Sequence, residues 1–173
     1  LLPVRFYTIA PNAEEVRSLL RTRYGELRQL LRELDGKVEL GLKAIWKDMN
    51  EVFRQVADTA PEDRRPGARD SAGVRQALEE KRAELRQLLL AALKPVAVDF
   101  RLNKTYGDDM VVNAAFLVDR RREKEFDSLV AQVGASLART VELKYVGPVP
   151  PYSFVNIVIR GDLGLAEMGA KER

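Results

Sequence analysis

The stretch KVELGLKAIWK, residues Lys37–Lys47, alternates between apolar and polar positions. Every even-numbered position in it is apolar. The charged residues share the odd-numbered positions: Lys37, Glu39, Lys43 and Lys47. A period of two is typical of a strand with one buried face and one solvated face. The stretch therefore predicts a half-buried β-strand.

Helical and extended patterns follow this strand in a regular order. Apolar residues at spacings of three and four predict helices at Val74–Leu93 and Glu123–Leu137. Alternating or almost fully apolar runs predict the remaining strands: Val96–Asn103, Met110–Val118, and Val141–Val146 with a continuation at Tyr152–Ile159. The order strand, helix, strand, strand, helix, strand is the split βαβ or ferredoxin-like arrangement, an antiparallel sheet with helices on one face. The predicted fold class is therefore α+β.

The chain divides into three predicted parts. Residues 36–160 form the ferredoxin-like C-terminal domain, and residues 161–173, which lack periodicity, form a flexible tail. Residues 1–35 are expected to be the remnant of an N-terminal α/β domain with a long helix. Because the chain begins at Leu1 rather than at an initiator methionine, we expect the rest of that domain to precede it.

Two regions outside the regular pattern have elements of their own. The N-terminal part is predicted to hold a strand at Val4–Ile9 and one long amphipathic helix at Asn12–Leu34. The leucine stripe of this helix favours an antiparallel or coiled-coil-like pairing with the helix at Val74–Leu93. In the first crossover, a short helix at Asp48–Ala57 precedes a polar loop at Asp58–Gly73.

Histidine and cysteine are both absent from the 173 residues. Their absence excludes Ser-His-Asp triads, thiolate nucleophiles, disulfides, zinc fingers and iron–sulfur clusters. The net charge of +3, from 29 basic and 26 acidic residues, is too small to indicate a nucleic-acid surface. The sequence has no apolar run long enough to span a membrane and no evident signal peptide, so we predict a soluble, cytoplasmic protein without nucleic-acid or membrane partners.

Two clusters of charged residues could carry chemistry, but each has a simpler structural explanation. The run Arg120–Arg122 could bind phosphate, yet its acidic neighbours indicate a solvated junction between a strand and a helix. Asp99, Asp108 and Asp109 could hold a cation, yet aspartate and glycine are also the residues that a hairpin turn needs. We therefore expect no catalytic residue, no metal site and no cofactor.

The segment GPVPPYSF at Gly147–Phe154, called the proline ridge below, is the most unusual stretch of the chain. Three prolines in four residues fix φ and remove amide donors, so the last strand must bulge or break here. A stiff surface of proline and aromatic rings loses little entropy on docking and suits a recognition element. The aromatic rings could equally pack into the core. The candidate partner-binding residues are Tyr145, Gly147, Pro148, Pro150, Pro151, Tyr152 and Phe154.

Four stretches of the chain carry a family resemblance: LPVRF at Leu2–Phe6, LDGKVE at Leu34–Glu39, GDDM through NAAFLV at Gly107–Val118, and GPVPPYSFV at Gly147–Val155. Together they resemble the gas vesicle protein L/F (GvpL/GvpF) family. The resemblance covers nearly the whole chain except the polar loop and the tail. Tyr7 and Val149 depart from residues that are common in the family.

This resemblance implies a non-enzymatic minor protein of the gas vesicle, the hollow, protein-walled buoyancy organelle of some bacteria and archaea. Family members are thought to bind the small hydrophobic shell protein and other accessory gas vesicle proteins during assembly. We therefore expect an assembly factor or minor structural protein that is located at the gas vesicle in the cytoplasm.

An alternative is a ferredoxin-like module that binds nucleic acid or a small ligand on its sheet. RNA binding on such a sheet needs exposed aromatic rings on the central strands. Trp46 and Phe116 instead share positions with apolar neighbours, which predicts that both rings are buried. The pattern therefore disfavours the nucleic-acid form of this alternative.

Overall fold

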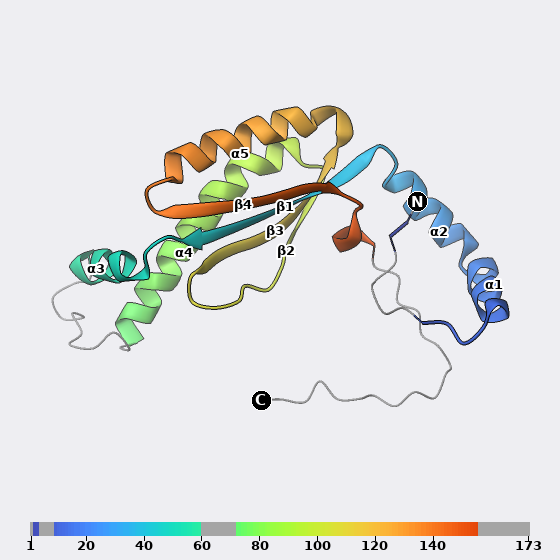
Figure 1. Cartoon of the computed structure of the whole chain (residues 1–173), viewed down its shortest axis with the longest axis horizontal. Helices are drawn as coiled ribbons and strands as arrows, with labels where there is room; N and C mark the ends of the chain where they lie inside the picture. The colour runs from blue at the N-terminus through green and yellow to red at the C-terminus, as the bar shows by residue number, and fades with distance from the viewer. Residues whose placement is uncertain (1, 4–8, 60–71, 156–173) are drawn as a thin grey trace.

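The computed structural model describes residues 2–3, 9–59 and 72–155 of the chain. Within these ranges, four strands form one antiparallel sheet in the order β2-β3-β1-β4. Their bounds are Lys37–Trp46 for β1, Asp99–Leu102 for β2, Met110–Asp119 for β3 and Val141–Val149 for β4. The crossover helices α4 (Ala72–Leu93) and α5 (Glu123–Leu137) cover one face of the sheet, as Figure 1 shows. The predicted α+β, ferredoxin-like fold is confirmed.

The main core lies between the sheet and these two helices. Leu40 and Leu42 of β1 are each 1% exposed, as the alternating pattern predicts for even-numbered positions. Leu40 pairs with Phe116 of β3, and the Phe116 ring lies 5.1 Å from the ring of Phe126 in α5, measured between centroids. Leu93 at the end of α4 is fully buried in the same cluster. Removal of this apolar surface from water is the main force that holds the helices on the sheet.

The predicted single helix at Asn12–Leu34 is wrong, because the chain bends at Arg23. Two helices stand in its place: α1 (Ala13–Thr22) and α2 (Tyr24–Glu33). Gly25 lies two residues after the bend, and glycine is the weakest helix former after proline. The Arg23 guanidinium donates two hydrogen bonds, at 2.7 and 2.6 Å, to the Glu26 carboxylate and so fixes the first turn of α2.

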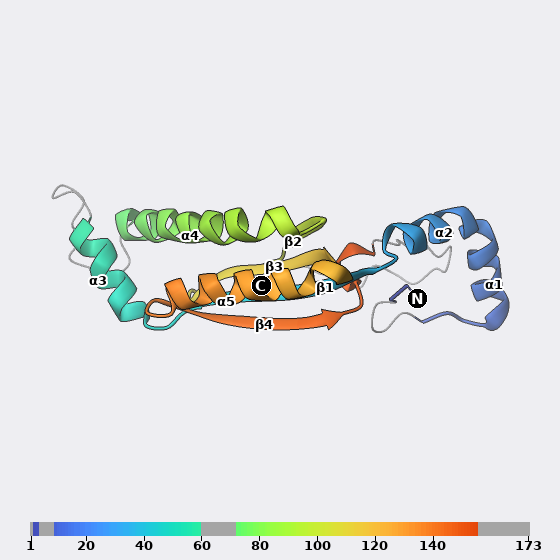
Figure 2. The same ribbon diagram turned by 90° about the horizontal axis from the view of Figure 1, so that it is seen from above.

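The predicted pairing of the two leucine-rich helices is also wrong. Figures 1 and 2 show α1 and α2 beyond one end of the sheet, whereas α4 lies over the face of the sheet. Neither α1 nor α2 has a buried residue. The buried side chains of α4 all join the main core: Val74, Leu78, Leu89, Leu90 and Leu93. An amphipathic stripe thus identified the apolar face of each helix but not the surface against which it packs.

The strand predicted at Val96–Asn103 is shorter than expected. Residues Lys94–Val96 form a 3₁₀ turn around Pro95, and β2 begins only at Asp99. Val98 and Leu102 are 57% and 48% exposed, so the alternation there does not mark a buried face. The reason is that β2 is an edge strand with β3 as its single neighbour in the sheet.

The predicted break in the last strand at Gly147 is wrong, whereas the predicted bulge is confirmed. β4 continues through a cis Gly147–Pro148 bond to Val149, with an irregular register between Glu39 and Gly41 of β1. The strand predicted to resume at Tyr152 is instead a 3₁₀ turn over Tyr152–Phe154.

The short helix predicted in the first crossover is confirmed as α3 (Met49–Thr59). Other predictions fall wholly or largely outside the described residues: the strand at Val4–Ile9, the polar loop at Asp58–Gly73, the end of the strand predicted at Tyr152–Ile159, and the tail at 161–173. Among the described helices, none is long and apolar enough to cross a membrane.

Candidate functional site

The end of the proline ridge folds back over the open face of the sheet, the face that α4 and α5 do not cover. Phe154 is 6% exposed and packs against Ala115 and Leu117, two odd-numbered residues of β3, with Leu34 at the margin. The Arg101 guanidinium lies 5.5 Å from the centre of the Phe154 ring, which is within reach of a cation–π interaction. Phe154 is therefore an anchor of the ridge rather than a freely exposed ring.

A buried carboxylate fixes the same turn. Glu39 of β1 is 8% exposed, and its two oxygens accept hydrogen bonds from the Ser153 amide and the Ser153 hydroxyl, both at 2.7 Å. The sequence placed Glu39 on a solvated face, and that prediction is wrong because a segment 114 residues away covers it. Hydrogen bonds of this kind to a charged group are among the stronger ones in proteins.

Gly147 allows β4 to pass close to β1. Its φ is +143°, and a Cβ placed there would lie 2.8 Å from Leu40 Cδ2 and 3.0 Å from the Glu39 carbonyl oxygen. Neither the backbone angle nor the space suits a side chain. The glycine is therefore required by the bulge that brings the ridge over the open face.

The candidate partner-binding residues fall into three environments. Gly147, Pro148, Pro150 and Tyr152 are exposed, with Tyr152 at 51%. Pro151 and Phe154 are buried beneath the turn. Tyr145 lies on the other side of the sheet. Its ring packs beside Phe126 of α5.

The Tyr145 hydroxyl donates a 2.6 Å hydrogen bond to the Asp127 carboxylate. Partial burial, with this carboxylate beside the phenol, raises the pKa of Tyr145 above its ordinary value. The structure thus separates Tyr145 from the ridge aromatics Tyr152 and Phe154, although the sequence analysis grouped all three as candidate binding residues.

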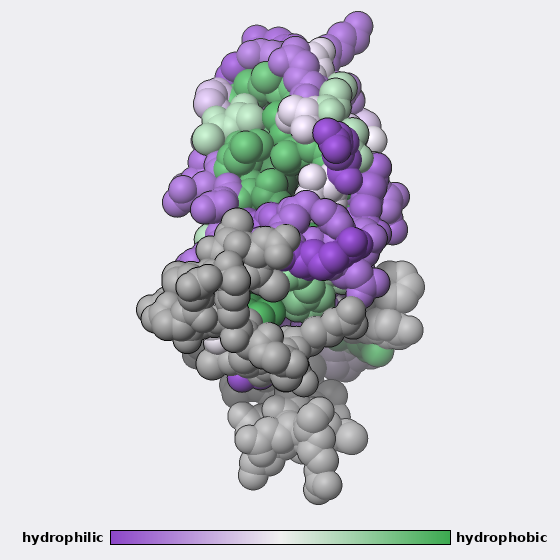
Figure 3. Space-filling model, turned by 90° about the vertical axis from the view of Figure 1, so that its left-hand side faces the viewer, coloured by the Kyte–Doolittle hydropathy of each residue, from purple (hydrophilic) through white to green (hydrophobic). Residues whose placement is uncertain are grey.

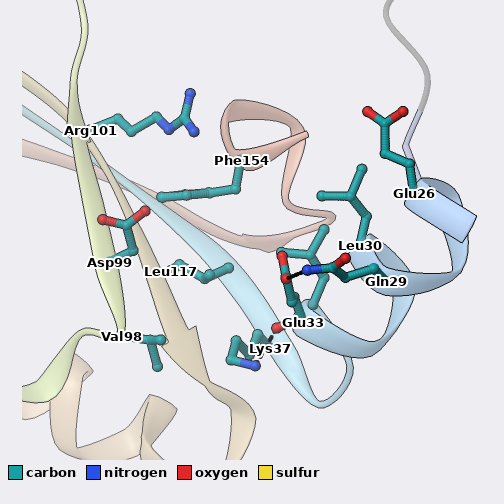
Figure 4. Close-up of a pocket in the computed structure, with 11 residues that line it drawn as sticks. Glu26, Gln29, Leu30, Glu33, Lys37, Val98, Asp99, Arg101, Leu117 and Phe154 are labelled. Atoms are coloured by element: carbon teal, nitrogen blue, oxygen red, sulfur yellow. Dashed lines mark hydrogen bonds between the residues drawn. The ribbon is translucent and has the colours of Figure 1, made fainter. Parts of the chain in front are cut away.

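Figure 4 shows a groove of about 660 Å³ between this turn and α2. Leu117 lines it from β3, Phe154 from the turn, and Leu30 from α2. Leu34 and Val98 add to the apolar lining, and the charged and polar lining residues are Glu26, Gln29, Glu33, Lys37, Asp99 and Arg101. An apolar floor with a mixed polar rim is suited to a side chain of another polypeptide. The sequence missed this groove because it predicted neither the bend at Arg23 nor the fold-back of Phe154.

A second groove of about 770 Å³ lies between α2 and the exposed part of the ridge. Leu31 lines it from α2, and Pro148 through Pro151 line it from the ridge. Leu34 and Lys37 line both grooves. The leucines of α2 therefore line two grooves and do not pack together into a single core.

Apolar surface is also exposed at the opposite end of the molecule, where Figure 3 shows hydrophobic residues gathered among hydrophilic ones. The elements at that end are α3, the start of α4 and the end of α5. Their partly buried apolar residues include Met49, Phe53, Ala77, Val133 and Leu137.

The other charged clusters have local partners. Arg121 lowers the pKa of Asp119 to about 2, chiefly through the hydrogen bond from its guanidinium and then through the bond from its backbone amide. Arg122 is paired with Glu125, which leaves no cluster of three free arginines for phosphate. In the described ranges, no group of three acidic side chains is placed to hold a metal ion.

The aromatic residues of the central strands do not form an RNA-binding platform. Phe116 is fully buried and Trp46 is 3% exposed, and both belong to the core beneath the helices. This agrees with the position that their strand parity predicts. The geometry thus gives no support to nucleic-acid binding on the sheet.

The fold and this site define a ferredoxin-like α+β protein with two grooves between its α2 helix and the adjoining end of the sheet. The family model of the gas vesicle synthesis proteins GvpL/GvpF matches residues 1–156. The chain therefore belongs to the GvpL/GvpF family of gas vesicle synthesis proteins.

Individual relatives agree with this assignment. Gas vesicle protein F1 of Halobacterium salinarum is 26% identical and aligns over 92% of this chain and 61% of its own length. Gas vesicle protein L of a Streptomyces species is 31% identical over 90% of this chain and 62% of its own length. The chain spans about six-tenths of the length of the first curated relatives that it matches: 61%, 60% and 63%.

Solved structures of the family share the fold. The crystal structure of the gas vesicle protein GvpF from Anabaena sp. PCC7120 has a TM-score of 0.78 and 25% identity, over 91% of this chain and 70% of that chain. GvpF from Microcystis aeruginosa has a TM-score of 0.76, at 20% identity over 90% of this chain and 70% of that chain.

Proposed function

We propose that this chain is a non-enzymatic accessory or minor structural protein of the gas vesicle. It acts in vesicle assembly by binding the small hydrophobic shell protein and other gas vesicle proteins. The observation that carries the proposal is the family match over residues 1–156, because the matched family is described by gas vesicle synthesis. The relatives named above are likewise gas vesicle proteins.

The surface of the chain is compatible with binding a hydrophobic partner. The two grooves beside α2 combine leucine and proline side chains with charged rims. Tyr152 stands beside them, half exposed, on a turn that Glu39 and Phe154 hold in place. Because this turn is fixed before a partner arrives, little conformational entropy is lost on docking. We assign the exposed part of the ridge as the first binding surface to test.

A co-sedimentation assay with purified shell protein tests the proposal. We expect the chain to sediment with assembled shell protein, and no binding at any concentration would contradict the proposed function. Tyr152→Ala removes an exposed aromatic ring, and we expect it to weaken binding about tenfold or more if the ridge is a hot spot.

Tyr106→Ala is the matched control, since Tyr106 is 65% exposed and lies in the loop between β2 and β3. Both variants should unfold at the same urea concentration as the unmodified chain. Binding that is unchanged by Tyr152→Ala would place the partner surface elsewhere, for example at the apolar end with α3, and would leave the function itself intact.

A further inference from the structure

The two edges of the sheet differ in length and in protection. β2 forms one edge and has four residues, whereas β4 forms the other and has nine. Figure 2 shows no described element beside the outer edge of β4. An edge strand presents unpaired N–H and C=O groups, and a long exposed edge is a template for another strand.

The side chains of β4 alternate between the two faces of the sheet. Val141, Leu143 and Tyr145 pack with the core on the helix side. Glu142, Lys144 and Val146 therefore lie on the open face, and all three are exposed.

The register leaves two like charges together on this face. Lys144 lies directly opposite Lys43 of β1, and both lysines are exposed. Like charges directly opposite each other destabilise a strand pair. Among the described residues, neither lysine forms a salt bridge, and Glu142 forms none either. On the open face, the edge residue Lys144 thus lies beside another lysine, and the edge residue Glu142 has no salt-bridge partner among the described residues.

We propose that the β4 edge binds the β4 edge of a second copy of this chain, antiparallel, about a two-fold axis through Leu143. In that register Glu142 of each copy lies opposite Lys144 of the other, so both charges gain a partner on the open face. On the helix side, Val141 of each copy lies opposite Tyr145 of the other. The sheets of the two copies then become continuous, with the helices of both on the same side.

Charge selects this register over its neighbours. A shift of the axis to residue 142 places Glu142 opposite Glu142, and a shift to residue 144 places Lys144 opposite Lys144. Either arrangement sets like charges against each other. At the far end, Pro148 has no amide donor and the bulge at Gly147 disturbs the edge, so pairing stops before the ridge. The ridge and the grooves stay open in the dimer, and this inference does not depend on the proposed function.

Sedimentation velocity over a concentration series tests the dimer by charge reversal. Glu142→Lys or Lys144→Glu alone replaces both cross-copy attractions with repulsions, so each should raise the dimer dissociation constant about tenfold or more. The double variant exchanges the two charges and should restore the dissociation constant of the unmodified chain.

Exposed residues of α4 supply matched controls: Glu84→Lys and Arg86→Glu change the net charge equally, away from the edge. A chain that stays monomeric at all concentrations would overturn the proposal. The proposal would also be overturned if the charge reversals at Glu142 and Lys144 weakened the dimer no more than the control substitutions do. Failure of the double variant to restore dimerisation would overturn it as well.

The absence of cysteine from the chain allows a second test. A single Leu143→Cys substitution places one thiol from each copy at the axis, within the range that a disulfide can bridge. Mild oxidation should give a covalent dimer that reducing agent reverses. Val146→Cys lies off the axis, opposite Thr140 of the other copy, and should stay monomeric. Equal cross-linking of the two variants would contradict the register.

Discussion

The same six residues, Glu-Leu-Arg-Gln-Leu-Leu, occur in α2 at Glu26–Leu31 and in α4 at Glu84–Leu89, yet the two helices use them differently. In α4, Leu89 is 1% exposed in the main core and Leu88 is 47% exposed. In α2, the equivalent of Leu89 is Leu31, which is 43% exposed, while Leu30, the equivalent of Leu88, is half buried. The same six-residue sequence therefore buries its last leucine in α4, whereas in α2 the leucine before it is the more buried of the two.

The difference follows from what each helix contacts. α4 lies on the sheet with α5 beside it, so its core-facing residues such as Leu78, Leu89 and Leu93 are removed from water. Apart from α1, the described parts that lie beside α2 are the end of the sheet and the proline ridge, across grooves that leave its leucines partly solvated. The covered face of the sheet is thus closely packed, whereas part of the apolar surface around α2 stays in contact with solvent.

The largest expected effect is a difference in stability between the same substitution made in the α4 copy and in the α2 copy of the hexapeptide. Leu89→Ala leaves a cavity in a closely packed core and should lower the free energy of unfolding by about 2–5 kcal/mol. Leu31→Ala removes a side chain that is already solvated, so it should change the free energy of unfolding by no more than about 0.5 kcal/mol. Urea unfolding followed by circular dichroism measures both. Equal losses would mean that α2 is as well packed as α4, against the exposed fractions given above.

The second effect tests the turn on the open face. Ser153→Ala removes the hydroxyl that donates to Glu39 and leaves one buried carboxylate oxygen with a lost partner. Because the acceptor is charged, we expect a loss of about 1.5–3 kcal/mol in the free energy of unfolding.

Ser128→Ala is the control, since the Ser128 hydroxyl bonds only within the exposed surface of α5, to the carbonyl of Lys124. It should change stability by at most about 0.5 kcal/mol. A Ser153→Ala variant as stable as this control would show that the hydroxyl bond to Glu39 does not stabilise the turn.

Much of the covered face was predictable from sequence, whereas most of the open face was not. Period-two alternation in β1 and the almost fully apolar run of β3 specify strands by local pattern alone, and α5 was predicted with its observed bounds. Glu39 and Phe154 could not be placed, because their burial depends on contacts between distant segments: Glu39 bonds to Ser153, 114 residues away, and Phe154 packs on β3. The hexapeptide shows the same limit of sequence-based prediction. Its pattern of leucines predicts an apolar helix face but not which of those leucines packs against another element.

The third effect compares two glycines, one in α2 and one at the ridge. Gly147→Ala forces a side chain into a backbone angle and a space that exclude it, and should cost about 1–3 kcal/mol in the free energy of unfolding. Gly25→Ala adds a methyl group to α2 where no other atom lies within 4 Å. It should stabilise the chain by about 0.5–1 kcal/mol, because alanine is the better helix former. A neutral Gly147→Ala would show that the bulge can relax.

The smallest effect concerns Tyr145 on the covered side and Tyr152 on the ridge. Tyr145→Phe deletes the hydrogen bond to Asp127 and should lower the free energy of unfolding by about 0.5–1.5 kcal/mol at neutral pH. Tyr152→Phe removes the hydroxyl of a half-exposed residue, so it should change the free energy of unfolding by less than about 0.5 kcal/mol.

The pH dependence of the Tyr145 effect has a definite sign. Burial, aided by Asp127, raises the pKa of Tyr145 in the folded chain, so the unfolded chain loses this proton first, near pH 10. The contribution of Tyr145 is therefore complete below about pH 10 and falls as the pH rises toward the raised folded value. The stability gap between the unmodified chain and Tyr145→Phe should narrow between neutral pH and about pH 11, as measured by urea unfolding at each pH. If the difference in unfolding free energy stays constant with pH, the Tyr145 phenol ionises equally in the folded and the unfolded chain. The burial of Tyr145 and its hydrogen bond to Asp127 would then have no more effect on ionisation than the exposed position of Tyr152 has.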